Sequence, residues 1–209
     1  MPARSYGQYC GLARSLDTVG DRWSLLIVRE LLLGPLRYGE LAASLGGIAT
    51  NLLADRLRSL EASGVVERRL GASGGVVYAL TPWGEELRET VESLVRWSRP
   101  LMLAGRGEDA FRPRWLAVAL PALLGGRTAR PAAEVGIEVP GLSLALRLDE
   151  TGPHVTIEPE QRAGTVLAAE PEVVLGLAAG ALTLDQALAV AHVDGARGPL
   201  AAVFARAPA

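Results

Sequence analysis

Residues 15–34 read SLDTVGDRWSLLIVRELLLG, and from Asp21 onward the spacing of the apolar side chains is helical. These side chains return to one side of a helix every three or four residues, at Trp23, Leu26, Ile27, Leu31 and Leu33. Gly34-Pro35 ends the pattern, because glycine accepts the left-handed cap conformation and proline cannot continue a helix. The run therefore predicts an amphipathic helix.

Two shorter helices are predicted next, over residues 38–45 and 50–63. The first has Leu41 and Leu45 on its inner face, and Gly46-Gly47 closes it. The second ends at Gly64, and its apolar stripe consists of Leu53, Leu57 and Leu60. Its opposite stripe consists of Asn51, Ala54, Asp55 and Arg58.

A β-hairpin and a long helix are predicted after this third helix. Residues 65–70 and 76–80 are typical of strands, and the turn between them is rich in glycine. Thr81-Pro82 then begins a helix that extends to about residue 103. This helix carries a seam that suits a partner helix, at Leu87, Val91, Leu94, Ser98 and Leu101. Helices followed by such a hairpin indicate a winged helix-turn-helix, so DNA is the first partner to consider.

Candidate DNA-binding residues follow from this arrangement. The N-terminal half of a recognition helix enters the major groove, where asparagine pairs with adenine and arginine with guanine or phosphate. Phosphate contacts are expected from the hairpin and from the starts of helices. The candidates are Arg22, Arg37, Thr50, Asn51, Arg58, Arg68 and Arg69. The alternatives are that each arginine is a solvated surface charge, or that the fold serves protein interaction.

Residues 10 to about 100 resemble the HxlR family of winged-helix transcriptional regulators. The resemblance rests on Cys10, Leu16-Asp17, Gly20-Asp-Arg-Trp-Ser-Leu-Leu-Ile27, Arg29-Glu-Leu31, Gly34-Pro35, Arg37-Tyr-Gly-Glu-Leu41, Gly47-Ile48, Leu53-Ala-Asp-Arg-Leu-Arg-Ser-Leu-Glu61, Gly64-Val-Val-Glu-Arg68, Val77-Tyr-Ala-Leu-Thr81 and Gly84. It implies a homodimer that forms through the terminal helices and binds inverted-repeat DNA. The residues expected to mediate dimerisation are Leu87, Val91, Leu94 and Leu101.

Two departures from the family pattern affect the DNA-binding part. Ala49 stands where a serine commonly precedes the recognition helix, so either Thr50 caps the helix or the helix starts one residue later. The hairpin tip has Ser73-Gly74-Gly75 in place of the usual prolines, which predicts a flexible wing.

Cys10 occupies the position where some members of the family sense oxidants or electrophiles. A reactive thiol needs exposure and a lowered pKa, and Arg14 lies one helical turn further on. Free cysteine is among the most often buried residue types, so an inert packing role is the favoured interpretation. With one cysteine in the chain, a switch would require a bridge between subunits or an adduct with a small thiol.

A second domain is predicted after the polar, glycine-rich residues 105–109. The predicted helices are 115–124, 172–179, 184–190 and 199–206, and the predicted strands are 136–139, 142–148, 154–158, 165–167 and 192–193. Residues 165–195 resemble the end of a sterol-carrier-protein-like domain, which implies an apolar tunnel; a packed core is the alternative. The expected fold class is α+β, with a winged helix-turn-helix domain over 1–106 and a smaller α+β domain over 107–209.

Composition limits the other classes of protein. The chain has 209 residues, 49% of them hydrophobic and 21% charged, as in globular proteins. Residues 1–106 carry a net charge of +2 and residues 107–209 a net charge of −4. No apolar run is long enough for a membrane span and no secretory signal is evident, so a cytoplasmic protein is expected. Enzyme motifs are absent, and His154 and His192 are expected at strand or surface positions.

The sequence therefore predicts a homodimeric DNA-binding transcriptional regulator that a small apolar ligand controls through the second domain. No enzyme activity, cofactor or metal is expected. Two alternatives remain: control by thiol modification of Cys10, and a lipid-binding carrier protein in which the winged helix only mediates dimerisation.

Overall fold

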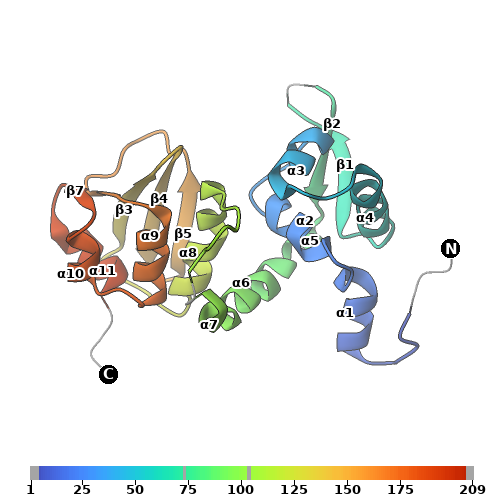
Figure 1. The fold of residues 1–209 in the computed structure, drawn as a ribbon, viewed down its shortest axis with the longest axis horizontal. Coiled ribbons are helices and arrows are strands. Elements are labelled where there is room, and N and C mark those ends of the chain that lie inside the picture. The colour runs from blue at the N-terminus through green and yellow to red at the C-terminus, as the bar shows by residue number, and fades with distance from the viewer. Residues whose placement is uncertain (1–4, 73, 103–104, 206–209) are drawn as a thin grey trace. The chain divides into compact units, whose positions relative to one another are not determined.

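The computed structural model describes residues 5–72, 74–102 and 105–205. The chain divides into two compact units, Met1–Val91 and Glu92–Ala209 (Figure 1). The division lies inside helix α6 (Leu87–Trp97), earlier than the boundary predicted after residue 106. The reason is that side chains after Val91 bind the second unit: Arg96 donates to the carbonyl oxygen of Ala122 at 3.5 Å. Where the chain can be cut into separately folding domains stays a prediction.

The first unit contains the predicted helix-turn-helix and hairpin. Helices α2 (Ser24–Leu31), α3 (Tyr38–Leu45) and α4 (Thr50–Ala62) match the three expected helices. Strands β1 (Val66–Leu70) and β2 (Val76–Leu80) pair antiparallel, with Leu70 opposite Val76 at the tip. Helix α1 (Gly11–Val19) precedes them and was not predicted as an element.

The core of the first unit joins α2, α3, α4 and the hairpin. It contains the fully buried side chains Ile27, Leu31, Leu41, Leu53, Leu57 and Leu60. A charged residue also lies inside: Glu30 has 0% exposure, forms an ion pair of 2.6 Å with Arg29, and accepts a hydrogen bond from the hydroxyl of Ser44. Because Glu30 lies on α2 and Ser44 on α3, this polar cluster fixes one helix against the other.

The prediction of one continuous helix over residues 82–103 is wrong. The structure has three segments, α5 (Pro82–Glu85), α6 (Leu87–Trp97) and α7 (Arg99–Met102); residue 103 lies outside the described residues. Pro100 explains the second break, because it has no N–H to donate to the carbonyl four residues earlier. Thr81 caps α5 as expected, accepting a hydrogen bond of 3.0 Å from the amide of Gly84. A Cβ on Gly84 would lie 2.1 Å from the carbonyl oxygen of Val65, so this contact requires glycine.

The second unit is a mixed α/β structure, as predicted. Its strands are β3 (Ala133–Val139), β4 (Leu142–Asp149), β5 (Gly152–Ile157), β6 (Val166–Ala168) and β7 (His192–Asp194). They form one sheet in the order β5-β4-β3-β6-β7, in which only the β3–β6 pair is parallel. A short 3-10 turn, η1 (Pro113–Trp115), leads into the first helix of this unit, and the helices are α8 (Leu116–Leu124), α9 (Pro171–Ala179), α10 (Leu184–Leu188) and α11 (Arg197–Phe204).

One face of this sheet packs against helices and the other faces solvent. On the inner face Ile137 lies opposite Leu144 and Val135 opposite Leu146, and these four side chains are no more than 1% exposed. Helix α8 packs on β5 and α11 on β3, in front of the strands in Figure 1. Along each strand every second side chain lies on the outer face, and those that are exposed there include Glu134, Ser143, Arg147 and His154. The core of this unit is therefore a layer between a sheet and its helices.

Candidate nucleic-acid interface

Helix α4 presents the side chains expected of a recognition helix. The side chains of its inner stripe, Leu53, Leu57 and Leu60, are no more than 1% exposed. The opposite side is exposed at Thr50, Asn51, Asp55 and Arg58. The predicted division of the helix into a core face and a polar face is confirmed, and the polar face begins at the N-terminal end of the helix.

The start of α4 differs from the predicted cap. Ala49 is the N-cap residue and makes no side-chain cap hydrogen bond, so Thr50 is the first helical residue and does not cap the helix. The side-chain oxygen of Asn51 accepts a hydrogen bond of 3.0 Å from the amide of Leu52. The hydroxyl of Tyr38, at the start of α3, donates a 2.6 Å hydrogen bond to the carbonyl oxygen of Thr50. Sequence analysis did not identify Tyr38, because spacing along the chain gives no sign of this contact.

Three candidate arginines form exposed ion pairs. Arg58 lies 2.6 Å from Asp55, and Arg69 lies 3.9 Å from Glu67. Arg68 lies 2.8 Å from Glu61, whose hydrogen bond and charge raise the pKa of Arg68. Exposed ion pairs contribute about 0 to 1 kcal/mol, so little free energy opposes exchanging the carboxylate for a phosphate.

Arg37 lies at the start of a helix, as predicted, and Arg22 lies just before one. Arg22 is two residues before α2, and its guanidinium lies 5.8 Å from the ring centroid of Trp23. Trp23 has a φ of 82°, in the left-handed region that bulky residues rarely adopt. Arg37 is the N-cap residue of α3, but its guanidinium donates to the wing, at 2.8 Å from the carbonyl oxygen of Gly74.

Another arginine that sequence analysis did not select, Arg56, connects the recognition helix to the turn before α2. Its guanidinium forms an ion pair with Asp21. The pairing joins residues far apart in sequence, so no local pattern identifies it. It adds a polar tie between α4 and the GDRW segment that begins at Gly20.

Cys10 is exposed, so the buried packing role predicted for it is wrong for the described chain. It is the N-cap residue of α1. The backbone amides of Ala13 and Leu12, at the start of α1, favour the thiolate and lower the pKa of Cys10. Exposure and a lowered pKa are the two properties that a reactive thiol needs.

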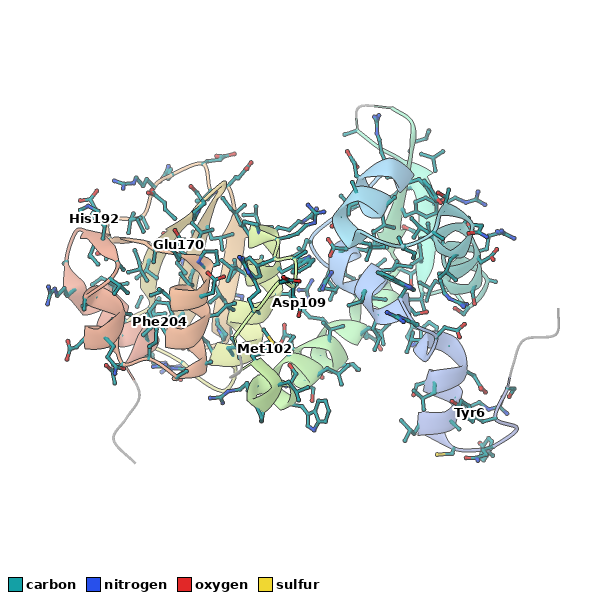
Figure 2. All side chains as sticks on the ribbon, viewed as in Figure 1. Tyr6, Met102, Asp109, Glu170, His192 and Phe204 are labelled. Carbon is teal, nitrogen blue, oxygen red and sulfur yellow. The ribbon has the colours of Figure 1, made fainter. Side chains whose placement is uncertain are left out.

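The four predicted dimerisation residues fall into different environments. Val91 is buried within its own chain at 6% exposure, and Leu87 is half-buried. Leu94 and Leu101 are exposed at 44% and 68%. Two further apolar side chains that sequence analysis missed are exposed on α6 and α7. They are Trp97 and Met102, and Figure 2 labels Met102. Helix α1 likewise exposes Leu12 and Leu16, and Tyr6, labelled in Figure 2, is exposed ahead of this helix.

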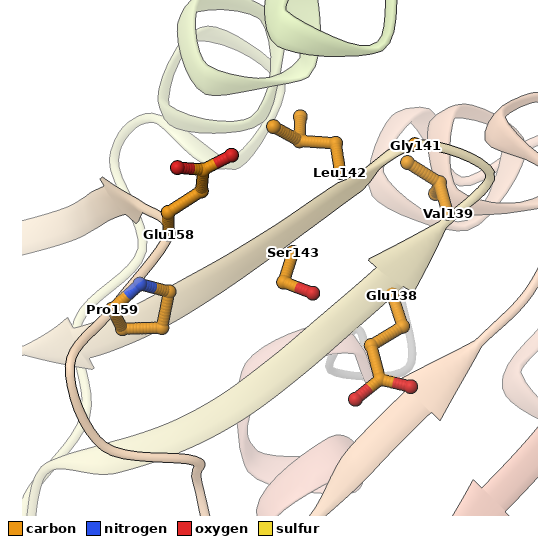
Figure 3. A pocket seen from close by; sticks show the side chains of 7 residues that line it. All are labelled: Glu138, Val139, Gly141, Leu142, Ser143, Glu158 and Pro159. Carbon is orange, nitrogen blue, oxygen red and sulfur yellow. The ribbon is translucent and has the colours of Figure 1, made fainter.

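Two surface hollows lie on the second unit. One, of about 510 Å³, opens beside the β3–β4 turn, and Figure 3 shows Glu138, Ser143 and Glu158 around it. The other, of about 260 Å³, lies near the β4–β5 turn and is bordered by Arg130, Arg147, Asp149 and Glu150. Charged side chains border both hollows, so neither is an apolar tunnel. His154 and His192 lie on strands at the surface, as expected.

The described residues contain neither a membrane-spanning helix nor a cluster of metal-binding side chains. Within residues 5–72, 74–102 and 105–205, no helix combines the length and apolar character that crossing a bilayer requires. In the same ranges, no three side chains of His, Cys, Asp or Glu are grouped as metal ligands.

Comparisons with known proteins bear on the first unit. The profile of the HxlR-like helix-turn-helix family matches residues 18–104. The chain is 34% identical over 110 residues to the uncharacterized HTH-type transcriptional regulator YtfH of Escherichia coli, covering 50% of this chain and 87% of YtfH. It is 39% identical over 88 residues to the uncharacterized HTH-type transcriptional regulator Rv3095 of Mycobacterium tuberculosis, covering 41% of this chain and 55% of Rv3095. Among solved structures, the reduced form of the transcriptional regulator YodB from B. subtilis is 30% identical and covers 47% of this chain and 99% of its own, with a TM-score of 0.41.

Proposed function

The chain belongs to the HxlR-like helix-turn-helix family and is a DNA-binding transcriptional regulator of that type; we propose that it binds inverted-repeat operators as a homodimer. In this proposal the two α4 helices enter successive major grooves, about one helical turn or 34 Å apart. Family membership favours this function over that of a lipid carrier with a winged helix for dimerisation.

The polar face of α4 carries the proposal for base recognition. Thr50 and Asn51 lie exposed in the first turn of the helix, which is the part that reaches base edges. Arg58 lies two turns further on, where guanine or phosphate is within reach of a guanidinium. Arg68 and Arg69 on β1 and Arg22 before α2 are proposed to contact phosphates on either side.

Anisotropy titrations with operator fragments selected from genomic DNA, at two salt concentrations, test this assignment. Asn51→Ala and Arg58→Ala are each expected to weaken operator binding by about 1 to 3 kcal/mol. Arg130→Ala is the matched control for Arg58→Ala, because Arg130 is also an exposed arginine paired with a carboxylate, that of Glu150, but lies in the second unit. The proposal would be contradicted if the wild type and the three variants all bound operator DNA no more tightly than unrelated DNA.

Exposed apolar side chains support the proposed homodimer. Leu94, Trp97 and Leu101 are each more than two-fifths exposed, and a second copy is the partner that the family resemblance implies. Leu94→Glu is expected to convert the dimer into monomers in sedimentation equilibrium, whereas Val190→Glu, at an exposed residue after α10, leaves it intact. A wild-type protein that stays monomeric at micromolar concentration would exclude this part of the proposal.

We also propose that the second unit is a sensor for a small apolar molecule. The support is the sequence resemblance of residues 165–195 to sterol-carrier domains and the fact that the family match ends at residue 104, so most of this unit lies beyond it. Ile137, Leu144 and Leu146 fill the layer between sheet and helices, so a ligand would have to enter by separating that layer. Control of DNA binding requires different ligand affinities for two states of the dimer. Native mass spectrometry of the purified protein tests for a bound lipid, and delipidated protein is the control.

A thiol switch at Cys10 is a second candidate for regulation, because this thiol is exposed and its pKa is lowered. Oxidant is expected to weaken DNA binding of the wild type and to leave Cys10→Ser unaffected. Loss of DNA binding by Cys10→Ser under the same oxidant would reject the switch.

A further inference from the structure

The segment Leu36–Tyr38, which leads into α3 and includes its first residue, contacts both parts of the first unit that are proposed to meet DNA. Leu36 pairs with β2 through its backbone: its amide donates to the carbonyl oxygen of Tyr78 at 3.0 Å, and the amide of Tyr78 donates back at 2.8 Å. Leu36 therefore forms an isolated antiparallel β-bridge beside the hairpin. It places the next two side chains between the wing and the recognition helix.

Arg37 holds the turn at the tip of the wing. Its guanidinium donates a 2.8 Å hydrogen bond to the carbonyl oxygen of Gly74. Gly74 and Gly75 have φ values of 76° and 83°, which only glycine adopts without strain. The turn closes on itself through hydrogen bonds of 2.9 Å from Gly74 to Gly71 and from Gly71 to Gly75. Ser73, in the same turn, lies outside the described residues. A turn rich in glycine has high conformational entropy, so one charged anchor restricts it strongly.

Tyr38 holds the first residue of the recognition helix. Its hydroxyl donates a 2.6 Å hydrogen bond to the carbonyl oxygen of Thr50, where α4 begins. Ala49 provides no side-chain cap at this end. The position of the first turn of α4 relative to α3 therefore depends on a tyrosine from the neighbouring helix. Adjacent residues of one segment thus anchor the wing and the recognition helix.

We propose that Leu36–Tyr38 is a clamp that fixes the wing and the recognition helix in one spatial relation, with Arg37 and Tyr38 as positioning residues for operator recognition. The inference rests on the proposed operator binding and assigns Arg37 a different role from the phosphate contact predicted from sequence. A clamp acts before DNA arrives, because it removes conformational freedom that binding would otherwise have to remove.

The first test needs no DNA. Hydrogen exchange of the Gly71 and Gly74 amides, both bonded within the wing turn, is expected to become at least about tenfold faster in Arg37→Ala. Tyr38→Phe, which loses only the hydroxyl, is expected to speed exchange in the first turn of α4 and to leave the wing unchanged. Arg58→Ala is the control and should change neither. Unchanged exchange at the wing in Arg37→Ala overturns the clamp, whatever the protein does with DNA.

The second test is a double-mutant cycle on operator DNA. A shortened wing replaces residues 71–75 by Asn-Gly, which forms a tight two-residue hairpin turn and removes the Gly74 acceptor. Arg37→Ala is expected to lose about tenfold in operator affinity in the natural wing and less than about twofold in the shortened wing. Arg58→Ala, the control, should lose the same factor in both backgrounds.

A phosphate contact by Arg37 gives a different result. The factors by which Arg37→Ala and the shortened wing reduce operator affinity would then multiply. Arg37→Ala would also lower the slope of log affinity against log salt concentration by about one in either background. That outcome overturns the positioning role. Absence of operator selectivity in the wild type would instead refute the proposed function, and the exchange measurements would still decide whether the clamp exists.

Discussion

Each of the two units is stabilised by a different kind of core. The first unit has three buried polar residues, Ser24, Glu30 and Ser44, among its helices. In the second unit Thr165 is the buried polar residue among the described ones, and the layer between sheet and helices is otherwise apolar. Apolar packing is non-directional, whereas a buried hydrogen-bonded carboxylate has a preferred geometry.

This difference suggests what each core specifies. Reading DNA requires that α3 and α4 keep a fixed mutual placement, and the Glu30–Ser44 contact ties α2 to α3. A ligand-responsive unit requires that layers be able to separate, and apolar contacts re-form without leaving unpaired polar groups. The first core is therefore suited to precise placement and the second to rearrangement, and substitutions in either core test this difference.

The largest effect is expected from Glu30→Ala. Removing one member of a buried ion pair costs about 3 to 5 kcal/mol, and the lower end applies here because Arg29 is 19% exposed. Urea unfolding followed by hydrogen exchange in peptides of each unit should show the loss in the first unit alone, and operator affinity should fall. Glu30→Gln keeps hydrogen-bonding atoms and should lose less. An equal loss in both units would break the comparison.

Leu146→Ala is the corresponding change in the second core. Leu146 has 0% exposure, so the substitution removes buried methyl groups and leaves a cavity that costs about 2 to 5 kcal/mol. The same exchange experiment should show this loss in the second unit, with operator affinity unchanged. Val190→Ala, at a side chain that is 69% exposed, is the control and should change neither. Loss of operator binding by Leu146→Ala would show that the first unit depends on the second core.

The elements that the sequence predicted well are those whose apolar faces are buried in their own unit. Helix α3 has the predicted bounds, and the hairpin strands differ by one residue. Helix α1 was not predicted: it buries only the small or β-branched residues Ala13 and Val19, and its leucines, Leu12 and Leu16, are exposed. The break before α7 was missed although Pro100 indicates it, because the seam of Leu94 and Leu101 was taken as continuous.

The candidate interface was predictable in its residues but not in its contacts. Composition and helical spacing selected Asn51 and Arg58, and both lie on the exposed face of α4. The role of Arg37 could not be obtained this way, because its acceptor, Gly74, lies in another element and the contact depends on tertiary structure. The pairing of Arg56 with Asp21 has the same origin.

A smaller effect is expected from Ser44→Ala, which sharpens the comparison within the first core. The substitution deprives Glu30 of the hydroxyl donor from α3 and is expected to cost about 1 to 3 kcal/mol of unfolding free energy. Ser59→Ala, at an exposed serine of α4, should stay within about 0.5 kcal/mol of the wild type. Urea midpoints at constant slope measure both. A neutral Ser44→Ala would mean that polar geometry does not hold α2 against α3.

The smallest effect concerns Asp149, at the surface of the second unit. Hydrogen bonds from the hydroxyl and amide of Thr151 lower the pKa of Asp149 to about 2, below its ordinary value of 3.8. Because the folded pKa is the lower one, ionised Asp149 stabilises the β4–β5 turn above pH 3.8, and this contribution is lost as the pH falls through about 2.

Thr151→Val removes the hydroxyl and keeps the amide, so the pKa of Asp149 should rise part of the way toward 3.8 in an NMR titration of its carboxyl carbon. The acid-induced loss of the turn then begins at higher pH. Thr156→Val, at an exposed position of β5, is the control. An unchanged pKa in Thr151→Val would mean that the hydroxyl contributes nothing there. The Asp149 carboxylate would then be held by the Thr151 amide and its other neighbours without help from that hydroxyl.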